Sequence, residues 1–531
     1  MELLTTPVLE NAYINRRTFA IISHPDAGKT TLTEKLLLYG NAIELAGNVR
    51  ARRNQHSTTS DWMAMERERG ISITSTVLQF PYRDRVINLL DTPGHQDFSE
   101  DTFRTLTAVD SAVMVLDAAK GIEPQTRRLF EVCRKRGIPI FTFINKMDRP
   151  ARSPLELLDE IEKILGMQPV PMNWPLGDGL DFKGVYDRQK KGVYLYERTE
   201  RNERMSPETF LSIESLRSSG ILLDNHMDKL QSEIELLEGL GITYDYDQVL
   251  AGEQTPVFFG SALTNFGVHL FLDAFVEMAP VPQAYASDAG LVYPGDEAFS
   301  GFVFKIQANM NPKHRDSIAF VRICSGHFER GINVIHAQTG KAFRLARSYK
   351  LFASERLVIE EAYPGDVIGL PNTGDFAIGD TLCGGKPFKF SPIPRFQPEY
   401  FALLRNQDVN KQKQFFKGLQ QLELEGAVQV LYNIDAFRRE PILAVVGQLQ
   451  FDVVRSRLES EYTVPTGIEP LALELARWVT GPEESILHIT SRSDVILAKD
   501  SDEQYVALFR EPYYLRYTLE KFPELHLDTK S

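Results

Sequence analysis

The stretch FAIISHPDAGKT, residues 19–30, decides the fold of the N-terminal part of the chain. Its first five residues form an apolar run typical of a buried strand, and Gly28-Lys29-Thr30 then opens a helix, as in phosphate-binding loops. Such a loop surrounds a β-phosphate with backbone N–H groups, reaches the β- and γ-oxygens with the lysine and places a hydroxyl on Mg²⁺. Ser23 stands where the usual pattern has glycine, so its backbone has to avoid angles that only glycine tolerates. The alternative is a strand-to-helix turn with a solvated lysine.

A second motif, Asp91-Thr92-Pro93-Gly94-His95, ends the apolar run 86–91. In nucleotide hydrolases a carboxylate here holds Mg²⁺ through water, and a flexible glycine turns its N–H toward the γ-phosphate. His95 follows the glycine, where a donor and acceptor could reach an in-line water; a loop histidine is the alternative. Aspartate and glycine often share turns, so the motif gains weight from its place at a strand's carboxyl end, where open α/β sheets bind ligands.

Asn145-Lys146-Met147-Asp148 follows another apolar run and indicates which nucleotide binds. A carboxylate can accept hydrogen bonds from both the ring N–H and the exocyclic amine of guanine, whereas adenine offers no such pair. A charged acceptor left unpaired costs about 1.5–3 kcal/mol per lost bond, so Asp148 can reject ATP. Ser261-Ala262-Leu263, at the end of the last run, is placed to complete the base pocket through backbone groups.

Apolar runs alternate with amphipathic stretches from residue 18 to about residue 280, as in a mostly parallel sheet with crossover helices. The expected strands are 19–23, 76–82, 86–91, 111–117, 138–145 and 256–262. The expected helices are 30–39, 98–109, 125–136, 155–165 and a last one through 268–275. Ser153-Pro154-Leu155-Glu156 predicts a capping box with proline in the first helical position. The sequence therefore predicts an α/β P-loop GTPase domain over residues 1–282.

Three further segments depart from this alternation. Residues 170–250 are turn-rich, then polar and acidic with helical character, and predict an insertion before the last strand. Short strands between glycine turns over 297–390 predict a β-barrel domain. Strands mixed with helices, among them 412–425, predict a C-terminal α+β domain over 395–531.

A long polar stretch between the first helix and the strand at 76 has no apolar periodicity, and such a loop in a compact domain is usually functional or disordered. It contains Arg50, Arg52 and Arg53 and then the segment 66–74, ERERGISIT. Its position predicts a switch segment that is ordered when a hydroxyl coordinates Mg²⁺ beside the γ-phosphate. The three arginines predict either an RNA contact or a solvated face.

Composition limits what the chain can bind and where it works. Its 59 basic and 72 acidic residues give a net charge of −13, which argues against binding nucleic acid by overall charge. The stretch 341–350 carries four basic residues and no acid, and predicts either a local RNA contact or a solvated barrel strand. Three cysteines without a C-x-x-C pair fit a reducing compartment. With neither a secretory leader nor a spanning segment in the pattern, we expect an unprocessed cytoplasmic protein.

These motifs, in the order SHPDAGKTT, RGISIT, DTPGHQDF, NKMD and SAL and followed by a barrel, resemble the translational GTPases of the elongation-factor superfamily. Length, Ser23 and Ser72 make the whole chain most similar to the class II peptide chain release factors. The resemblance implies that Thr30, Ser72 and Asp91 serve Mg²⁺ and that His95 is catalytic and orients the attacking water. It also implies that GTP or GDP is held by Ser23, His24, Pro25, Asp26, Ala27, Gly28, Lys29, Thr30, Thr31, Asp91, Thr92, Pro93, Gly94, His95, Asn145, Lys146, Met147, Asp148, Ser261, Ala262 and Leu263.

The resemblance further implies a monomeric, ribosome-stimulated GTPase of translation termination. It would stimulate the class I release factors and promote their departure from the ribosome after peptide release. Two alternatives stay open from the sequence: another ribosomal GTPase, translocase-like or a ribosome-protection factor, and a GTPase subunit that regulates a metabolic enzyme.

Overall fold

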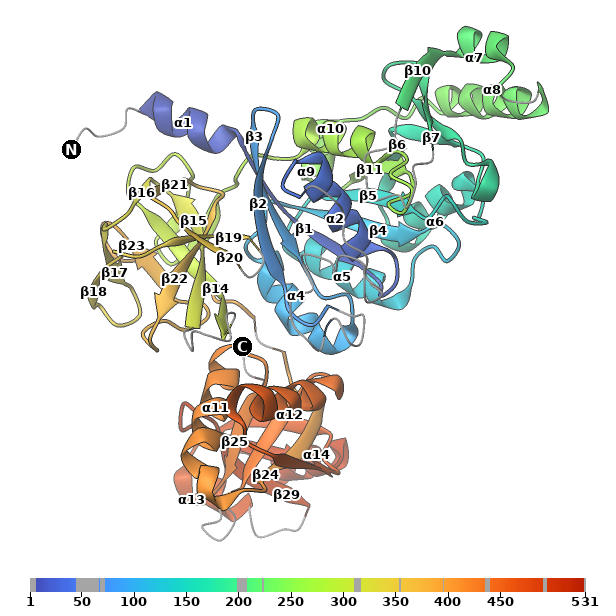
Figure 1. Ribbon diagram of the computed structural model, residues 1–531. Coiled ribbons are helices and arrows are strands. Elements are labelled where there is room, and N and C mark those ends of the chain that lie inside the picture. Colours follow the sequence, from blue (N-terminus) through green and yellow to red (C-terminus); the bar gives the residue numbers. More distant parts are fainter. Residues whose placement is uncertain are drawn as a thin grey trace.

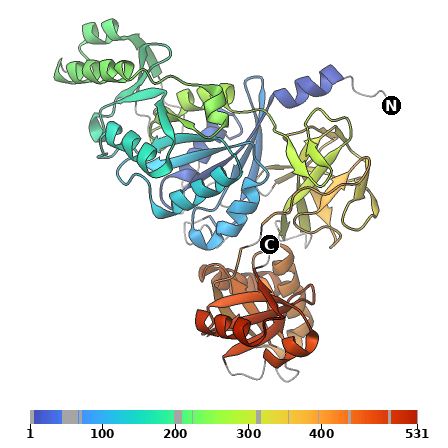
Figure 2. The ribbon, with the colours of Figure 1, turned by 180° about the vertical axis from the view of Figure 1, so that it is seen from behind.

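A computed structural model of the chain describes residues 6–43, 66, 72–197, 208–221, 224–309, 317–352, 355–394, 396–434, 440–489 and 494–529. Figure 1 shows an α/β body in blue to green, an antiparallel β body in yellow and an α+β body in orange and red. An outgrowth of the α/β body, in green, lies at the end farthest from the red body, and the view from behind agrees (Figure 2). This sequence of folds confirms the predicted fold class.

The α/β body is built on a parallel sheet with strand order β3-β1-β4-β5-β11-β6, to which β2 adds as an antiparallel neighbour of β3. The strands are β1 (Arg16–Ser23), β2 (Thr76–Tyr82), β3 (Arg85–Asp91), β4 (Ser111–Asp117), β5 (Ile140–Asn145), β6 (Gln168–Pro171) and β11 (Gln254–Phe259). Every residue of β4, β5 and β11 is buried, which is why these strands read as continuous apolar runs rather than alternating ones.

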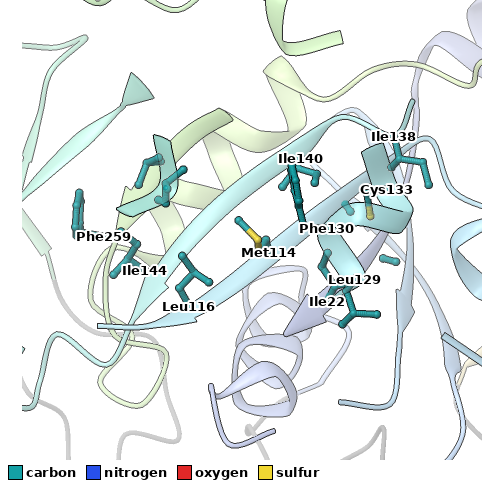
Figure 3. Packing of buried hydrophobic residues seen from close by; sticks show 14 of the residues in the cluster. Ile22, Met114, Leu116, Leu129, Phe130, Cys133, Ile138, Ile140, Ile144 and Phe259 are labelled. Atoms are coloured by element: carbon teal, nitrogen blue, oxygen red, sulfur yellow. The ribbon is translucent and has the colours of Figure 1, made fainter. Parts of the chain in front are cut away.

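Helices cover both faces of this sheet. α2 (Lys29–Tyr39) and α10 (Val268–Met278) share a core cluster with one face, and α4 (Ser99–Leu106), α5 (Pro124–Lys135) and α6 (Pro154–Leu165) share one with the other. Figure 3 shows the second cluster, where Leu129, Phe130 and Cys133 of α5 lie against the strands that carry Ile22 and Met114. The two clusters hold the carboxyl ends of the strands, where the motifs lie, on a rigid support.

Several local expectations need correction. Ser153 precedes α6, but its side chain makes no cap hydrogen bond, so the predicted capping box does not form, although Pro154 does open the helix. The helix expected over 98–109 is a 3₁₀ turn, η1 (Gln96–Phe98), followed by the shorter α4. The last strand ends at Phe259, three residues early, and the chain turns over residues 262–265. α1 (Thr6–Ile14) lies in a stretch for which no element was predicted.

The outgrowth contains a four-stranded antiparallel sheet, ordered β10-β9-β8-β7, that the sequence did not predict. Its elements are β7 (Asn173–Leu176), η2 (Gly179–Asp181), β8 (Gly184–Asp187), β9 (Gly192–Tyr196), β10 (Glu208–Ser212), α7 (Ile213–Ser219) and α8 (Asp224–Gly239). The chain then returns to the α/β body (Figure 1), where Val249 of α9 (Tyr246–Leu250) joins the core cluster of α2 and α10. The helices agree with the expected helical character. The strands are only four or five residues long, and three of them carry a glycine or a proline, so no periodic run marks them.

The β body is an antiparallel, barrel-like sheet with strand order β18-β17-β23-β14-β15-β22-β19, to which β20 adds on β19. Its strands are β14 (Ser300–Ala308), β15 (Ser317–Ser325), β17 (Asn333–His336), β18 (Ala342–Arg344), β19 (Tyr349–Phe352), β20 (Glu355–Val358), β22 (Val367–Asn372) and β23 (Thr381–Cys383). A backbone pairing of Phe352 with Leu78 joins this sheet to β2. Arg322 and Asp110, both fully buried, form a 2.6 Å ion pair between the two bodies.

The C-terminal body is an antiparallel sheet with helices packed on it, ordered β27-β24-β26-β25-β29-β30-β28-β31. Its strands are β24 (Tyr400–Asn406), β25 (Gln429–Asn433), β26 (Pro441–Val445), β27 (Thr466–Leu471), β28 (Leu475–Thr480), β29 (Val495–Lys499), β30 (Tyr505–Phe509) and β31 (His526–Asp528). Its helices are α11 (Gln412–Leu424), α12 (Leu449–Tyr462), α13 (Glu483–His488) and α14 (Pro512–Lys521). No described helix has the length and apolar character that crossing a membrane requires.

Candidate nucleotide site

The phosphate loop runs from Ser23, the last residue of β1, to Lys29, the first residue of α2. Asp26 and Gly28 adopt left-handed backbone angles, with φ of 65° and 96°, and so curl the chain around the helix N-terminus. Ser23 has an ordinary strand conformation, which is why serine is tolerated where the usual pattern has glycine. The loop therefore presents backbone N–H groups at the positive end of α2, an arrangement that attracts phosphate.

Asn145 connects the phosphate loop to the 261–263 turn, where the base pocket was predicted. Its Nδ2 donates to the carbonyl of Ala27 at 2.8 Å, and its Oδ1 accepts from the N–H of Ala262 at 2.8 Å. A Cβ on Gly28 would lie 2.3 Å from Nδ2 of Asn145, so this contact requires glycine at position 28. The motifs at 28, 145 and 262, far apart in the sequence, thus meet at one buried amide.

Asp148 is oriented by a serine from the last sheet turn. Ser261 donates through Oγ to Oδ1 of Asp148 at 2.6 Å and accepts from the N–H of Thr264. Met147 lies buried below, with its N–H bonded to the carbonyl of Gly260. Leu263 is 46% exposed, so its side chain sits at the rim rather than in the core. This geometry presents a fixed carboxylate where the sequence placed the guanine contact.

A pair that the sequence analysis overlooked braces the same loop. Lys146 has a left-handed backbone, with φ of 71°, and its ammonium lies 2.8 Å from Oδ2 of Asp117. Burial raises the pKa of Asp117, but the hydrogen bonds from Lys146 and from the N–H of Ala119 outweigh it and leave that pKa below its usual value. Asp117 ends β4, so the signal that drew attention to Asp91, a carboxylate at a strand's carboxyl end, was present here too.

Asp91 and Lys29 form a buried ion pair at 2.6 Å, Oδ1 to Nζ. Thr92 donates to the carbonyl of Ile21 at 2.6 Å, and Pro93 accepts from Thr102, so the start of this turn is fixed to β1 and α4. The lysine expected on phosphate and the aspartate expected near Mg²⁺ are therefore neighbours. A phosphate at this position would replace the carboxylate as the partner of Lys29.

The two hydroxyls expected on Mg²⁺ also lie close together: Oγ1 of Thr30 is 3.5 Å from Oγ of Ser72. Behind Ser72, the carboxylate of Glu66 accepts the N–H groups of Ile73 and Thr74 at 2.9 and 3.1 Å, which fixes the direction of this strand entry. Arg50, Arg52 and Arg53, and most of the predicted switch segment, lie outside the described residues.

His95 lies at the edge of the site, and its side chain is 32% exposed. Its Nδ1 is 3.0 Å from Oδ1 of Asp97 and 3.3 Å from the N–H of Asp97. The 3.0 Å contact needs a proton on Nδ1, because a carboxylate oxygen only accepts, whereas the N–H of Asp97 donates to an unprotonated Nδ1 at 3.3 Å. The shorter contact is the one that leaves Nε2 as an acceptor. Burial raises the pKa of Asp97, but the hydrogen bonds from His95 and from the N–H of Leu449 outweigh it, so that pKa is lowered.

Asp97 also connects the site to the C-terminal body, because its Oδ2 accepts the N–H of Leu449 at 2.7 Å. A Cβ on Gly447 would lie 2.3 Å from Cγ of Asp97, so the two loops are in close contact. Arg104, in the following helix α4, donates to the carbonyls of Glu425 and Gly426 at 3.2 and 2.8 Å. No pattern in the sequence indicated these contacts.

The phosphate loop, Ser72, the 94–95 turn and, on the base side, Lys146 and Arg149 line one open cleft of about 980 Å³, large enough for a nucleoside triphosphate. Asn145, Asp148 and the 261–263 turn are not among the residues that line it. Its walls include Ser23, His24, Pro25, Asp26, Gly28, Lys29, Thr30, Thr31, Ser72, Gly94, His95, Asp117, Lys120, Lys146 and Arg149. Four of these are lysines or arginines, which suits an anionic ligand although the chain as a whole is acidic. Gly94 lies against the phosphate loop, because a Cβ on it would be 3.6 Å from the backbone of Pro25.

Outside the cleft, the predicted basic stretch lies in β18 and β19 and the turn between them. Lys341, Arg344 and Arg347 are exposed and Lys350 is half-buried, a placement that fits both interpretations of the stretch. All three cysteines are free and buried, and burial raises the pKa of the Cys133 thiol to about 12, so it stays a protonated core residue of α5.

Family models match almost the whole chain. Residues 14–281 match the elongation factor Tu GTP-binding domain, 298–385 match elongation factor G domain 2, and 390–519 match the C-terminal domain of class II release factor RF3. Proteins called peptide chain release factor 3 from Gloeobacter violaceus and Gloeothece citriformis are 58% and 56% identical to it. Both alignments cover 98% of this chain, and 98% and 96% of those relatives.

The chain belongs to the peptide chain release factor 3 family. It is accordingly a guanine-nucleotide-binding GTPase of translation termination, as the motif order indicated. A crystal structure from Thermus thermophilus, 22% identical, superimposes with a TM-score of 0.69 over 91% of this chain and 72% of that one, which shows a shared fold.

Proposed function

We propose that the cleft binds GTP and GDP with the base between Asn145, Asp148 and the 261–263 turn and the phosphates on residues 23–31. Asp148 accepts the two guanine donors, and Ser261 holds it in the orientation for doing so. Lys29 exchanges Asp91 for the β- and γ-oxygens when phosphate arrives. The observation that carries the proposal is the single amide of Asn145, which ties the base turns to the phosphate loop.

The residues that would hold Mg²⁺ fit the ion. Two hydroxyl oxygens 3.5 Å apart, and the carboxylate of Asp91 that pairs with the neighbouring Lys29, are the hard oxygen ligands that this ion prefers. Bound there, Mg²⁺ would neutralise charge on the phosphates. Thr30 and Ser72 would contact it directly, and Asp91, released from Lys29, would accept from its water shell.

His95 positions the water that attacks the γ-phosphate. When Nδ1 of His95 is protonated and donates to Asp97, Nε2 can accept a hydrogen bond from that water and orient it in line with the γ-phosphate. The imidazole is held from one side by a group that also contacts the C-terminal body, so the position of that body affects the histidine. Contact of the C-terminal body with the ribosome would therefore change turnover, so we expect a slow intrinsic rate and a fast stimulated one.

In the cell, the protein would act as a monomer in the cytoplasm, stimulate the class I release factors and promote their departure after peptide release. Support comes from the names of the relatives and from the match of residues 390–519. The test is GTP turnover with and without ribosomes, and release of a labelled class I factor from post-termination ribosomes. Turnover that ribosomes leave unchanged would refute the proposal, and so would release that does not depend on GTP.

A further inference from the structure

The turn 177–181, at the base of the outgrowth, packs against the loop 145–151 of the α/β body, which carries Asp148. It connects β7 to β8 and contains the 3₁₀ turn η2. Gly177 and Gly179 both have left-handed backbones, with φ of 77° and 60°. A Cβ on Gly177 would lie 2.6 Å from the carbonyl oxygen of Asp181, so this turn can take its shape only with glycine at that position.

The contacts of this turn fall on the residues around Asp148. The N–H of Gly179 donates to the carbonyl of Met147 at 2.8 Å and lies 3.2 Å from the carbonyl of Arg149. Asp178 accepts the N–H of Ala151 through Oδ2 at 3.0 Å. The carbonyls directly before and after the guanine-reading residue are therefore both bonded to one N–H of the outgrowth.

The opposite side of the loop is bonded to the α/β body itself. Ser261 contacts the carboxylate of Asp148, and the carbonyl of Gly260 accepts the N–H of Met147 at 3.1 Å. Lys146 has a left-handed backbone that a non-glycine residue adopts only when its surroundings impose it. The loop is thus clamped between a sheet turn and the outgrowth, and loss of either side would let Asp148 shift.

A cavity of about 340 Å³ lies on the outer side of this clamp. Met147, Ala151 and Asp178 line it from the loop and the turn, and Lys229 and Glu233 line it from α8. Glu233 in turn accepts from the indole N–H of Trp174 in β7 at 2.8 Å. α8 therefore supports β7, the strand that leads into the turn, on the far side of this cavity.

We propose that Asp178 and Gly179 are positioning residues for Asp148, so that the outgrowth sets the affinity and selectivity for guanine nucleotides. The proposal rests on the function proposed above, because it assumes that Asp148 reads the base. The N–H of Gly179 and the carboxylate of Asp178 fix the backbone on both sides of Asp148. That backbone in turn fixes the Asp148 carboxylate, which accepts from the ring N–H and the exocyclic amine of guanine. Asp178 and Gly179 do not contact the nucleotide.

The experiment compares Asp178→Ala with Asp181→Ala in the full chain. Asp181 lies in the same turn, and within the described residues its side chain makes no hydrogen bond to the 145–151 loop, so it serves as a matched control. Dissociation constants are measured for GDP and for inosine diphosphate, which lacks the exocyclic amine. We expect Asp178→Ala to weaken GDP binding about fivefold, the effect of one hydrogen bond, and inosine diphosphate binding less than about twofold. Asp178→Asn, which keeps an acceptor oxygen, and Asp181→Ala should bind as the parent does.

If the turn only stabilised the fold, Asp178→Ala should weaken the binding of both nucleotides equally and lower the unfolding temperature. That result in Asp178→Ala would overturn the proposal. Gly179→Ala, which keeps the N–H but strains the backbone, provides a second variant and should lower the same selectivity ratio. If the parent protein itself fails to distinguish the two nucleotides, the base pocket proposed above is wrong; if it distinguishes them and both variants keep the ratio, the positioning role alone is wrong.

Discussion

The two ends of the nucleotide cleft are held in place in different ways. At the base end, Asn145 bonds to Ala262 and to Ala27 of the phosphate loop, and Ser261 bonds to Asp148, so the α/β body and its outgrowth supply every contact described above. At the phosphate end, His95 bonds to Asp97, and Asp97 bonds to Leu449 of the C-terminal body, 352 residues away. Selectivity thus depends on local contacts, whereas the catalytic histidine depends on how two bodies sit against each other.

This difference separates binding from hydrolysis. A base pocket that is assembled without the ribosome can select guanine at any time, and its hydrogen bonds need no rearrangement on binding. A histidine whose partner is shared with another body can respond to a ribosome that moves that body. Variants at the base end should therefore change affinity with little effect on the maximal rate, and variants at the phosphate end should do the opposite.

His95→Ala should give the largest effect. Without the imidazole, nothing orients the attacking water, so ribosome-stimulated GTP turnover should fall by about 10²–10⁴-fold. GDP affinity should stay within about twofold of the parent value, because the histidine bonds to Asp97 rather than to the base turns. Single-turnover hydrolysis on ribosomes and nucleotide titration measure the two quantities. If the variant hydrolysed GTP at the parent rate, His95 would have no role in hydrolysis, and only the conclusions about nucleotide binding at the base end would stand.

Asp148→Asn should give the next largest effect, at the other end. An amide cannot accept from both guanine donors, so the variant should lose GDP affinity by about 10²-fold or more. The amide can pair with xanthine, so the variant should gain affinity for xanthosine diphosphate (XDP). Turnover with saturating XTP on ribosomes should approach the parent rate with GTP, because the phosphate end is untouched. Unchanged GDP selectivity would contradict the base pocket, and a variant that bound XDP but did not hydrolyse XTP would contradict the separation of the two ends.

The sequence predicted those features of the site that depend on residues close together in the chain, namely the strands and the motifs that directly follow them. The strand at 111–117 was placed to the residue, because a strand buried on both faces reads as an unbroken apolar run. The strand at 76–82 was also placed to the residue, although Gln79 is half-buried and Pro81 is exposed. The motifs at 23–31, 91–95 and 145–148 follow such strands, so the structure brings them to one sheet edge as expected. Their chemical roles stay predictions, which the variants above test.

What the sequence did not predict depends on long-range packing. Asp97 was quoted within its motif without a role, because nothing near it in the chain indicates that Leu449 will donate to it. Lys146 and Asp117 come from different strands and meet only because β4 and β5 are neighbours. The four short strands of the outgrowth are stabilised by packing against each other and against α8, and their glycines and prolines concealed them.

Asp97→Asn tests the link between the phosphate end and the C-terminal body. The amide keeps the shape but loses the charge that accepts from His95 and Leu449, so stimulated turnover should fall about tenfold with GDP affinity unchanged. The pKa of Asp97 is depressed in the folded protein, so its contacts contribute stability above the ordinary carboxyl pKa of about 3.9 and lose it as the pH falls through the folded value. The variant should therefore show a flatter decline of unfolding temperature below pH 4 than the parent. Equal declines would mean that this carboxylate does not hold the two bodies together.

Ser261→Ala should give the smallest effect and is the most direct test of the base end. The hydroxyl donates to Asp148 at 2.6 Å, and its loss leaves the carboxylate attached to the same loop but less restricted in rotation. One such hydrogen bond to a charged group, partly replaced by water, is worth about 0.7–1.3 kcal/mol, so GDP should bind about three- to ninefold more weakly. Stimulated turnover at saturating GTP should not change, and Ser261→Thr, which keeps the hydroxyl, should restore the affinity. A fall in maximal turnover together with affinity would show that the two ends of the cleft are coupled through the Asn145 amide, and the division between a locally held base end and a phosphate end held across bodies would no longer stand.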